Sequence, residues 1–240
     1  MVLVPELTAE EKTRHNHLIH QYARDELGRE DVNIDLIGYG VHKGVYKVCS
    51  GSRGLLVAVG ASRELDRLLL EDYVALNELY ANAPSFFSKP YAHYTAHTNN
   101  LGELISMEYI DMPDLDKLKR ETIFGPHLKD LAYRLGRDLG EVFMLTGRYS
   151  SEPHDGNVLA SIRDGKLAPL KFCDPIQFLP GDLDDVVRSV MTYGDERREC
   201  ISFAHKFKQG LSEALVEVGG RNQTEASAEL AFMTRYSSIL

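Results

Sequence analysis

The chain has 240 residues, of which 43% are hydrophobic and 26% are charged, a balance that fits one large globular domain or two small lobes. Its formal net charge of −9 opposes general binding to a polyanion, so we expect no nucleic-acid partner. The three cysteines have neither a paired pattern nor a metal-ligand spacing, which suggests reduced thiols in a cytosolic setting. We see no Sec-type signal and no run of about 18 apolar residues, so we expect no membrane partner.

The first predicted element is a helix from about residue 8 to residue 27. Thr8 and Glu11 have the spacing of a capping box, apolar residues follow at helical spacing, and Gly28 would end the helix. Three histidines lie along it, and we interpret them as a solvent-exposed face: His15, His17 and His20.

From residue 33 the pattern changes to strands. Gly38 and Gly40 lie in a turn between two β segments, and a third segment covers residues 55–59. A Gly-x-Gly turn lets backbone amides approach phosphate oxygens, and its place between strands argues against a dinucleotide site, whose glycines precede a helix. A helix over residues 64–80 would pack on this sheet, and strands over 90–98 and 103–109 would complete it. The sequence therefore predicts a five-stranded antiparallel sheet with one packed helix.

The second half opens with a long helix after Pro126 that Gly147 closes. Two short apolar strands follow, residues 158–160 and 167–172, and the Asp-Gly pair between them indicates a tight hairpin turn. This hairpin would bring Asn157 and Asp174 together at one end. Amide and carboxylate oxygens are the ligands that a magnesium-dependent phosphoryl-transfer site requires. Three further helices are predicted over residues 182–193, 196–218 and 227–240.

Two sequence runs carry a family resemblance. Residues 37–48, IGYGVHKGVYKV, resemble the glycine-rich loop of protein kinases, and residues 107–115, MEYIDMPDL, resemble the kinase hinge. The resemblance implies an α+β, two-lobed protein-kinase-like fold with a five-stranded antiparallel N-lobe sheet plus helix and a reduced, mainly helical C-lobe. The expected organisation is an N-terminal helical extension over residues 1–32, an N-lobe over 33–110 and a C-lobe over 111–240.

The same resemblance implies ATP and Mg²⁺, or Mn²⁺ in its place, as cofactors. Val45 would cover the adenine, Met107 would be the gatekeeper, and Asp114 would meet the ribose. Backbone groups from Glu108, Tyr109 and Ile110 would face the adenine edge. The remaining residues expected at the nucleotide are Gly38, Gly40, Lys43, Ala58 and Leu159.

The third strand departs from the kinase pattern, because residue Gly60 stands where kinases carry a phosphate-binding lysine. The with-no-lysine kinases supply this ammonium from the glycine loop, and Lys43 occupies the corresponding position here, with Lys47 as the fallback. We choose Glu71 on the next helix as the carboxylate that pairs with the lysine. The competing carboxylates are Asp72 and Glu78.

The catalytic loop is also shorter than in most kinases. We assign Asp155 to the substrate hydroxyl, while the spacing of Glu152 keeps that residue open as the base. Asn157 and Asp174 are the expected metal ligands, and Cys173-Asp174-Pro175 stands in place of Asp-Phe-Gly.

A two-lobed kinase with so short a C-lobe and no Ala-Pro-Glu signature resembles the HopBF family of bacterial type III effectors. That resemblance implies an atypical serine/threonine protein kinase that acts on a eukaryotic heat-shock chaperone. It also implies a monomer that is made in the bacterial cytoplasm and reaches the host cytosol without a cleaved Sec signal. Two alternatives remain open: a small-molecule phosphotransferase of the aminoglycoside-kinase type and a nucleotide-binding pseudokinase.

Overall fold

The computed structural model describes residues 7–39, 42–50, 53–96, 101–119, 127–151, 155–163, 166–168, 170–182, 184–186, 188–189 and 201–219. Its contacts form two compact units. The first comprises Met1–Asn77 and Ser88–Asp111, and the second comprises Glu78–Phe87 and Met112–Leu240.

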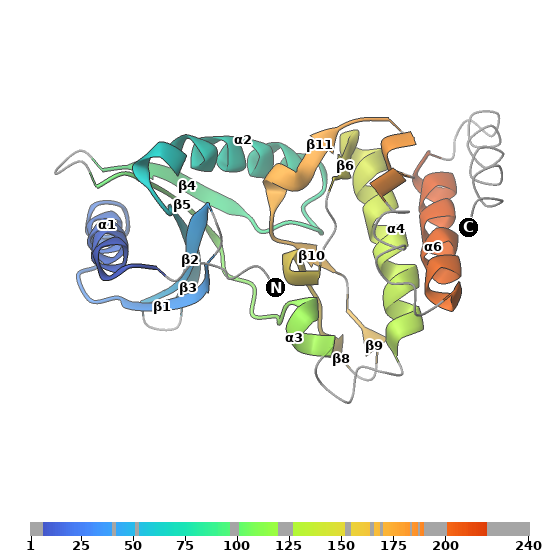
Figure 1. The fold of residues 1–240 in the computed structure, drawn as a ribbon, viewed down its shortest axis with the longest axis horizontal. Coiled ribbons are helices and arrows are strands. Elements are labelled where there is room, and N and C mark those ends of the chain that lie inside the picture. The colour runs from blue at the N-terminus through green and yellow to red at the C-terminus, as the bar shows by residue number, and fades with distance from the viewer. Residues whose placement is uncertain are drawn as a thin grey trace. The chain divides into compact units, whose positions relative to one another are not determined.

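A five-stranded antiparallel sheet forms the centre of the first unit (Figure 1). Its strands are β1 (Asn33–Tyr39), β2 (Lys43–Ser50), β3 (Arg53–Gly60), β4 (Pro90–Thr95) and β5 (Glu103–Glu108). They lie in the order β1-β2-β3-β5-β4, and every neighbouring pair is antiparallel. The α+β class and the five-stranded sheet predicted from the sequence are therefore confirmed.

Helix α1 (Ala9–Leu27) covers one face of this sheet. The predicted capping box is present, because the Thr8 amide donates to Glu11 Oε2 at 2.7 Å and the Glu11 amide donates to Thr8 Oγ1 at 3.2 Å. Gly28 ends the helix in the left-handed region at φ 62°. The residues that pack between helix and sheet are Leu18, Ile19, Tyr22, Tyr46, Val48, Val57, Val59, Tyr94 and Leu104. The segment predicted as an N-terminal extension thus shares a hydrophobic core with the sheet.

The 3-10 turn η1 (Arg63–Leu65) leads into helix α2 (Asp66–Asn82), which contacts the opposite face of the sheet. The ring of Tyr73 on α2 lies 5.9 Å from that of His93 on β4, whereas the next strand residue, Tyr94, packs against Tyr22 of α1. Successive side chains of a strand point to opposite faces, so α1 and α2 lie on the two sides of the sheet. Helix α2 is continuous across the boundary between the units. Its residues Asp66–Asn77 belong to the first unit, and its last turn belongs to the second.

The second unit is built around helices α3 (Leu115–Lys119), α4 (Leu128–Thr146) and α6 (Ile201–Gly219). Helices α4 and α6 approach so closely that a Cβ on Gly136 would lie 2.0 Å from the Phe207 carbonyl oxygen. A Cβ on Gly210 would lie equally close to the carbonyl oxygen of Tyr133. Gly147, with φ 64°, ends α4 as the sequence predicts.

Short strands and turns complete the second unit: β6 (Arg148–Ser150), η3 (Asp155–Asn157), β7 (Val158–Leu159), β8 (Ile162–Arg163), β9 (Lys166–Leu167), β10 (Lys171–Phe172), η4 (Pro175–Gln177) and β11 (Phe178–Pro180). Strand β7 pairs with β10, β8 with β9, and β6 with β11, all antiparallel. The predicted hairpin is therefore present. Of the predicted helix over 182–193, residues 184–186 and 188–189 are helical, and the helix predicted over 227–240 lies outside the described residues. Within the described part of the chain, no helix is both long and apolar enough to cross a membrane.

Candidate functional site

Lys43 begins β2, and its Cα partner on β3 is Gly60. Directly opposed residues of paired strands project to the same face, so Lys43 reaches the face toward which a side chain at position 60 would point. A Cβ on Gly60 would lie 2.5 Å from Asp66 Oδ1 at the start of α2, so a larger residue there would require the Asp66 side chain to move. Lys43 thus lies on the strand next to Gly60, on the same face of the sheet.

The Lys43 ammonium forms an ion pair with Asp72 on α2, with Nζ and Oδ2 2.5 Å apart. The side chains are 21% and 4% exposed respectively, so the pair lies mostly away from water. The choice of Glu71 as the partner was wrong, because the Glu71 side chain is exposed. Neighbouring helical residues differ by about 100° around the axis, which turns Asp72 toward the sheet and Glu71 toward solvent.

Three predicted adenine-site residues share the face of Lys43. Val45 is the Cα partner of Ala58, and Leu56, two residues before Ala58, is the partner of Met107. By the strand alternation, Lys43, Val45, Ala58 and Met107 all project to the α2 side of the sheet. Gly38 pairs with Val45 next to a register shift in β1. Gly40 lies outside the described residues.

The fallback lysine is engaged elsewhere. The Lys47 ammonium lies 4.3 Å from the centroid of the Tyr109 ring, and the hydrogen bond with Tyr109 raises the pKa of Lys47. Of the other predicted hinge residues, Glu108 ends β5 and donates its amide to the Lys89 carbonyl oxygen at 2.8 Å, and Ile110 follows the strand. The two lysines thus have different partners, Tyr109 for Lys47 and Asp72 on α2 for Lys43.

In the second unit, the predicted ribose residue Asp114 forms an isolated antiparallel bridge with Leu159. Asp114 Oδ1 accepts the Lys117 amide at 2.8 Å and Oδ2 lies 3.0 Å from Lys117 Nζ, so the carboxylate caps α3. Burial acts to raise the pKa of Asp114, but the hydrogen bonds from Lys117 outweigh it and lower the pKa below its ordinary value. The two predicted nucleotide residues are therefore brought together, with the carboxylate held ionised.

The backbones of the two predicted metal ligands lie at the same end of the β7–β10 pair. Val158 pairs with Phe172, and the Cys173 amide then donates to the Asn157 carbonyl oxygen at 3.0 Å, which brings Asn157 beside the residue before Asp174. Asn157 and Asp174 would supply two oxygen ligands, and phosphate and water oxygens would complete the coordination of a magnesium ion. Among the described side chains, no three His, Cys, Asp or Glu residues are grouped so that they could hold a metal.

Asp155 begins the η3 turn that also contains Asn157. Its side chain lies outside the described part of the structure, as do Glu152 and His154. The choice between Asp155 and Glu152 as the base therefore stays a prediction.

An aromatic cluster holds the backbone on both sides of Asp174. Phe172 and Phe178 have ring centroids 5.4 Å apart, and Phe87 lies 6.0 Å from the first and 5.1 Å from the second. The Phe172 amide also donates to the Phe86 carbonyl oxygen at 2.8 Å. Sequence reasoning missed this cluster, although the paired phenylalanines at 86 and 87 were a signal of a buried contact.

Two residues of α1 bind the end of β3, and sequence reasoning missed both. Arg14 donates to the Gly60 carbonyl oxygen and, at 3.2 Å, to that of Leu101. His15 is fully buried, which corrects its interpretation as part of a solvent-exposed face. Burial lowers the pKa of His15 to about 4, so the ring is neutral, and it lies 2.7 Å from the Tyr46 hydroxyl and 3.1 Å from the Gly60 carbonyl oxygen. These contacts fix the backbone opposite Lys43.

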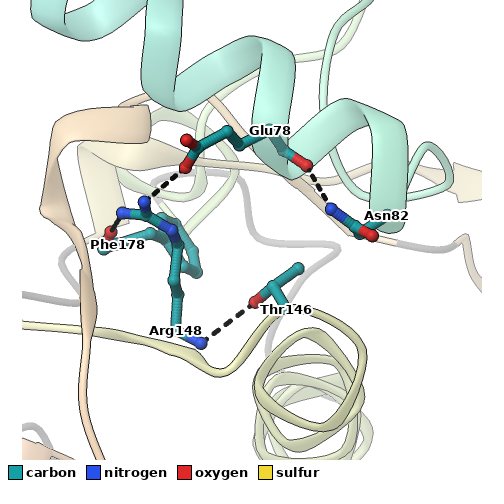
Figure 2. Close-up of polar contacts among 5 residues, drawn as sticks. All are labelled: Glu78, Asn82, Thr146, Arg148 and Phe178. Atoms are coloured by element: carbon teal, nitrogen blue, oxygen red, sulfur yellow. Dashed lines mark hydrogen bonds and ion pairs between the residues drawn. The ribbon is translucent and has the colours of Figure 1, made fainter.

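Arg148 at the start of β6 joins three elements of the second unit (Figure 2). It contacts Glu78 in the last turn of α2 and the Phe178 carbonyl oxygen in β11.

No protein-family model matches the sequence, and a comparison with curated proteins returns no match.

Proposed function

We propose that the chain is an atypical serine/threonine protein kinase that transfers the γ-phosphate of ATP to a hydroxyl group of a protein. The observation that carries the proposal is the buried Lys43–Asp72 ion pair on the sheet face shared with Val45 and Ala58. A lysine held by a helix carboxylate beside small apolar residues suits a triphosphate next to an adenine ring. Lys43 lies opposite Gly60, and in the proposed site it would supply the ammonium that the third strand lacks.

The second unit supports the same proposal. Asn157 and Asp174 lie at the same end of the β7–β10 pair, and Asp114 lies beside Leu159. In the proposed site, Asn157 and Asp174 would bind magnesium or manganese, which would neutralise charge on the phosphates. Asp114 would accept from the ribose, Leu159 would contact the adenine, and Asp155 would orient the substrate hydroxyl.

The proposed architecture is a minimal two-lobed protein-kinase-like fold, with the first unit as N-lobe and the second as a reduced C-lobe. The resemblance to the HopBF family supports a monomeric bacterial effector that acts in the host cytosol on a heat-shock chaperone. These finer proposals rest on the sequence runs around Gly38 and Met107.

The test is to incubate the purified protein with γ-labelled ATP, magnesium and a eukaryotic lysate, and in parallel with a panel of small-molecule acceptors. Labelled protein bands that are absent with Asp174→Asn would support the proposal. Labelled soluble product would instead indicate a small-molecule phosphotransferase. Nucleotide binding without any transfer would indicate a pseudokinase, and either result would overturn the proposal.

A further inference from the structure

Arg148 follows directly on the end of α4 and has three fixed contacts. Its amide donates to Thr146 Oγ1 at 3.1 Å, and that hydroxyl donates to the Val142 carbonyl oxygen at 2.7 Å. Its Nη1 donates to the Phe178 carbonyl oxygen at 3.0 Å, while Nη2 forms an ion pair with Glu78 (Figure 2). The guanidinium therefore has one branch on the β11 backbone and one branch on α2.

Glu78 belongs to the last turn of α2, which Asn82 also stabilises by donating its side-chain amide to the Glu78 carbonyl oxygen at 2.8 Å. The same helix carries Asp72, the partner of Lys43. Six residues of α helix span about 9 Å, a distance over which a continuous helix is stiff. A displacement of the last turn would therefore be passed to the carboxylate that holds the lysine.

We infer that Arg148 is a positioning residue, whose ion pair with Glu78 fixes the last turn of α2 and, through that helix, the Lys43–Asp72 pair. The catalytic consequence rests on the proposed function, whereas the effect on α2 does not. Arg148 lies two residues before Ser150, in the strand that leads toward the predicted catalytic loop.

The chain offers a matched control. Arg137 and Glu217 also form an arginine–glutamate pair, with side chains 27% and 55% exposed against 24% and 52% for Arg148 and Glu78. This control pair joins α4 to α6. Half-exposed ion pairs contribute little to global stability, so neither pair should be needed for folding.

The first experiment is hydrogen exchange on the protein without nucleotide. Glu78→Ala removes the α2 branch and keeps the contact of Arg148 with Phe178, so it isolates the proposed link. We expect Glu78→Ala and Arg148→Gln to speed amide exchange in the last turn of α2 and around Asp72. The control variants Glu217→Ala and Arg137→Gln should leave these amides unchanged. Unchanged exchange around Asp72 in Glu78→Ala would overturn the inference.

The second experiment measures kcat and KM for ATP. Glu78→Ala and Arg148→Gln should each lower kcat/KM by about fivefold, because loss of a partly exposed ion pair shifts the lysine site without removing it. The double variant should be no worse than either single variant, and Glu78→Ala should add nothing when Asp72 is already replaced by Asn. Independent, multiplying losses would overturn the inference. A wild-type protein without any transfer would defeat the proposed function and leave hydrogen exchange to decide the inference.

Discussion

The carboxylate of Asp138 accepts a hydrogen bond from the backbone amide of Leu170 at 3.2 Å, and the Asp138 side chain is only 3% exposed. Arg134 Nε lies 3.3 Å from the same oxygen. Burial nevertheless raises the pKa of Asp138 to about 7, with Arg134 acting in the opposite direction. A buried acid on α4 thus holds the segment that enters β10.

The raised pKa predicts how stability depends on pH. The unfolded carboxyl ionises near its ordinary value of 3.8, so the folded state holds the proton more tightly up to about pH 7. The protonated carboxyl contributes its full stabilisation below pH 3.8. As pH rises from 3.8 to 7, the free energy of unfolding falls by up to about 1.4 kcal/mol per pH unit, and above pH 7 this contribution is lost. Denaturant unfolding of wild type and Asp138→Asn from pH 4 to pH 8 checks this.

As pH rises, the wild type loses the stabilisation from its protonated Asp138 carboxyl, whereas the amide in Asp138→Asn does not ionise. We therefore expect Asp138→Asn to become more stable relative to wild type as pH rises. Its amide oxygen can still accept the hydrogen bond from Leu170. A pH-independent difference between wild type and Asp138→Asn would contradict the pKa shift.

Replacing Lys43 should damage the proposed kinase more than replacing Lys47. Lys43→Met removes the ammonium that would contact the phosphate oxygens of ATP. It should lower kcat/KM for ATP at least tenfold, the loss expected for a contact worth about 1.5–3 kcal/mol. Lys43→Arg should rescue poorly, because the planar guanidinium has a different geometry. Lys47→Met, which loses only the Tyr109 contact, should stay near wild type. An active Lys43→Met beside an inactive Lys47→Met would move the phosphate contact to Lys47.

Asp174→Asn should nearly abolish transfer without unfolding the protein, because an amide is a much weaker ligand for magnesium than a carboxylate. Asn157→Ala should mainly raise the magnesium concentration needed for half-maximal activity. Magnesium titrations of both variants, with circular dichroism to verify folding, provide the measurement. Near-wild-type turnover of Asp174→Asn at saturating metal would show that the metal assignment is wrong.

The base is tested by comparing two carboxylates. Asp155→Ala should bind ATP with wild-type affinity and fail to transfer phosphate, since it orients the acceptor hydroxyl and not the nucleotide. Glu152→Gln should remain active. The opposite pattern, an inactive Glu152→Gln with an active Asp155→Asn, would assign the base to Glu152.

Gly210→Ala should destabilise the second unit severely, by several kcal/mol, because its Cβ would lie 2.0 Å from the Tyr133 carbonyl oxygen and the helices must separate. Gly147→Ala has no atom within 4 Å of the added Cβ, so only its positive φ penalises it, by about 1–2 kcal/mol. Thermal unfolding of both variants gives the comparison. Equal losses would mean that close helix approach does not limit the α4–α6 packing.

Elements with local signals were predictable from the sequence. Thr8 and Glu11 mark the start of α1, and Gly28 and Gly147 mark two helix ends, because capping depends on residues a few positions apart. The pairing of β7 with β10, which puts Asn157 and Asp174 at the same end of the two strands, followed from hairpin geometry.

Features that depend on docking were not predictable. Glu71 and Asp72 are adjacent on α2, and only the rotation of the packed helix decides which one meets Lys43. His15 is polar, and its burial follows from its contacts with Tyr46 and Gly60, which lie far along the chain. Tertiary contacts of this kind override local pattern.

The packing of α1 on the sheet has a consequence for folding during synthesis. Tyr22 is hydrogen-bonded to Ser106 across 84 positions of sequence, and Leu104 belongs to the same core. Helix α1 therefore cannot complete the burial of its apolar face until β5 has emerged. At about 5–20 residues per second, that interval lasts several seconds or more, during which the helix remains open to chaperones and to aggregation.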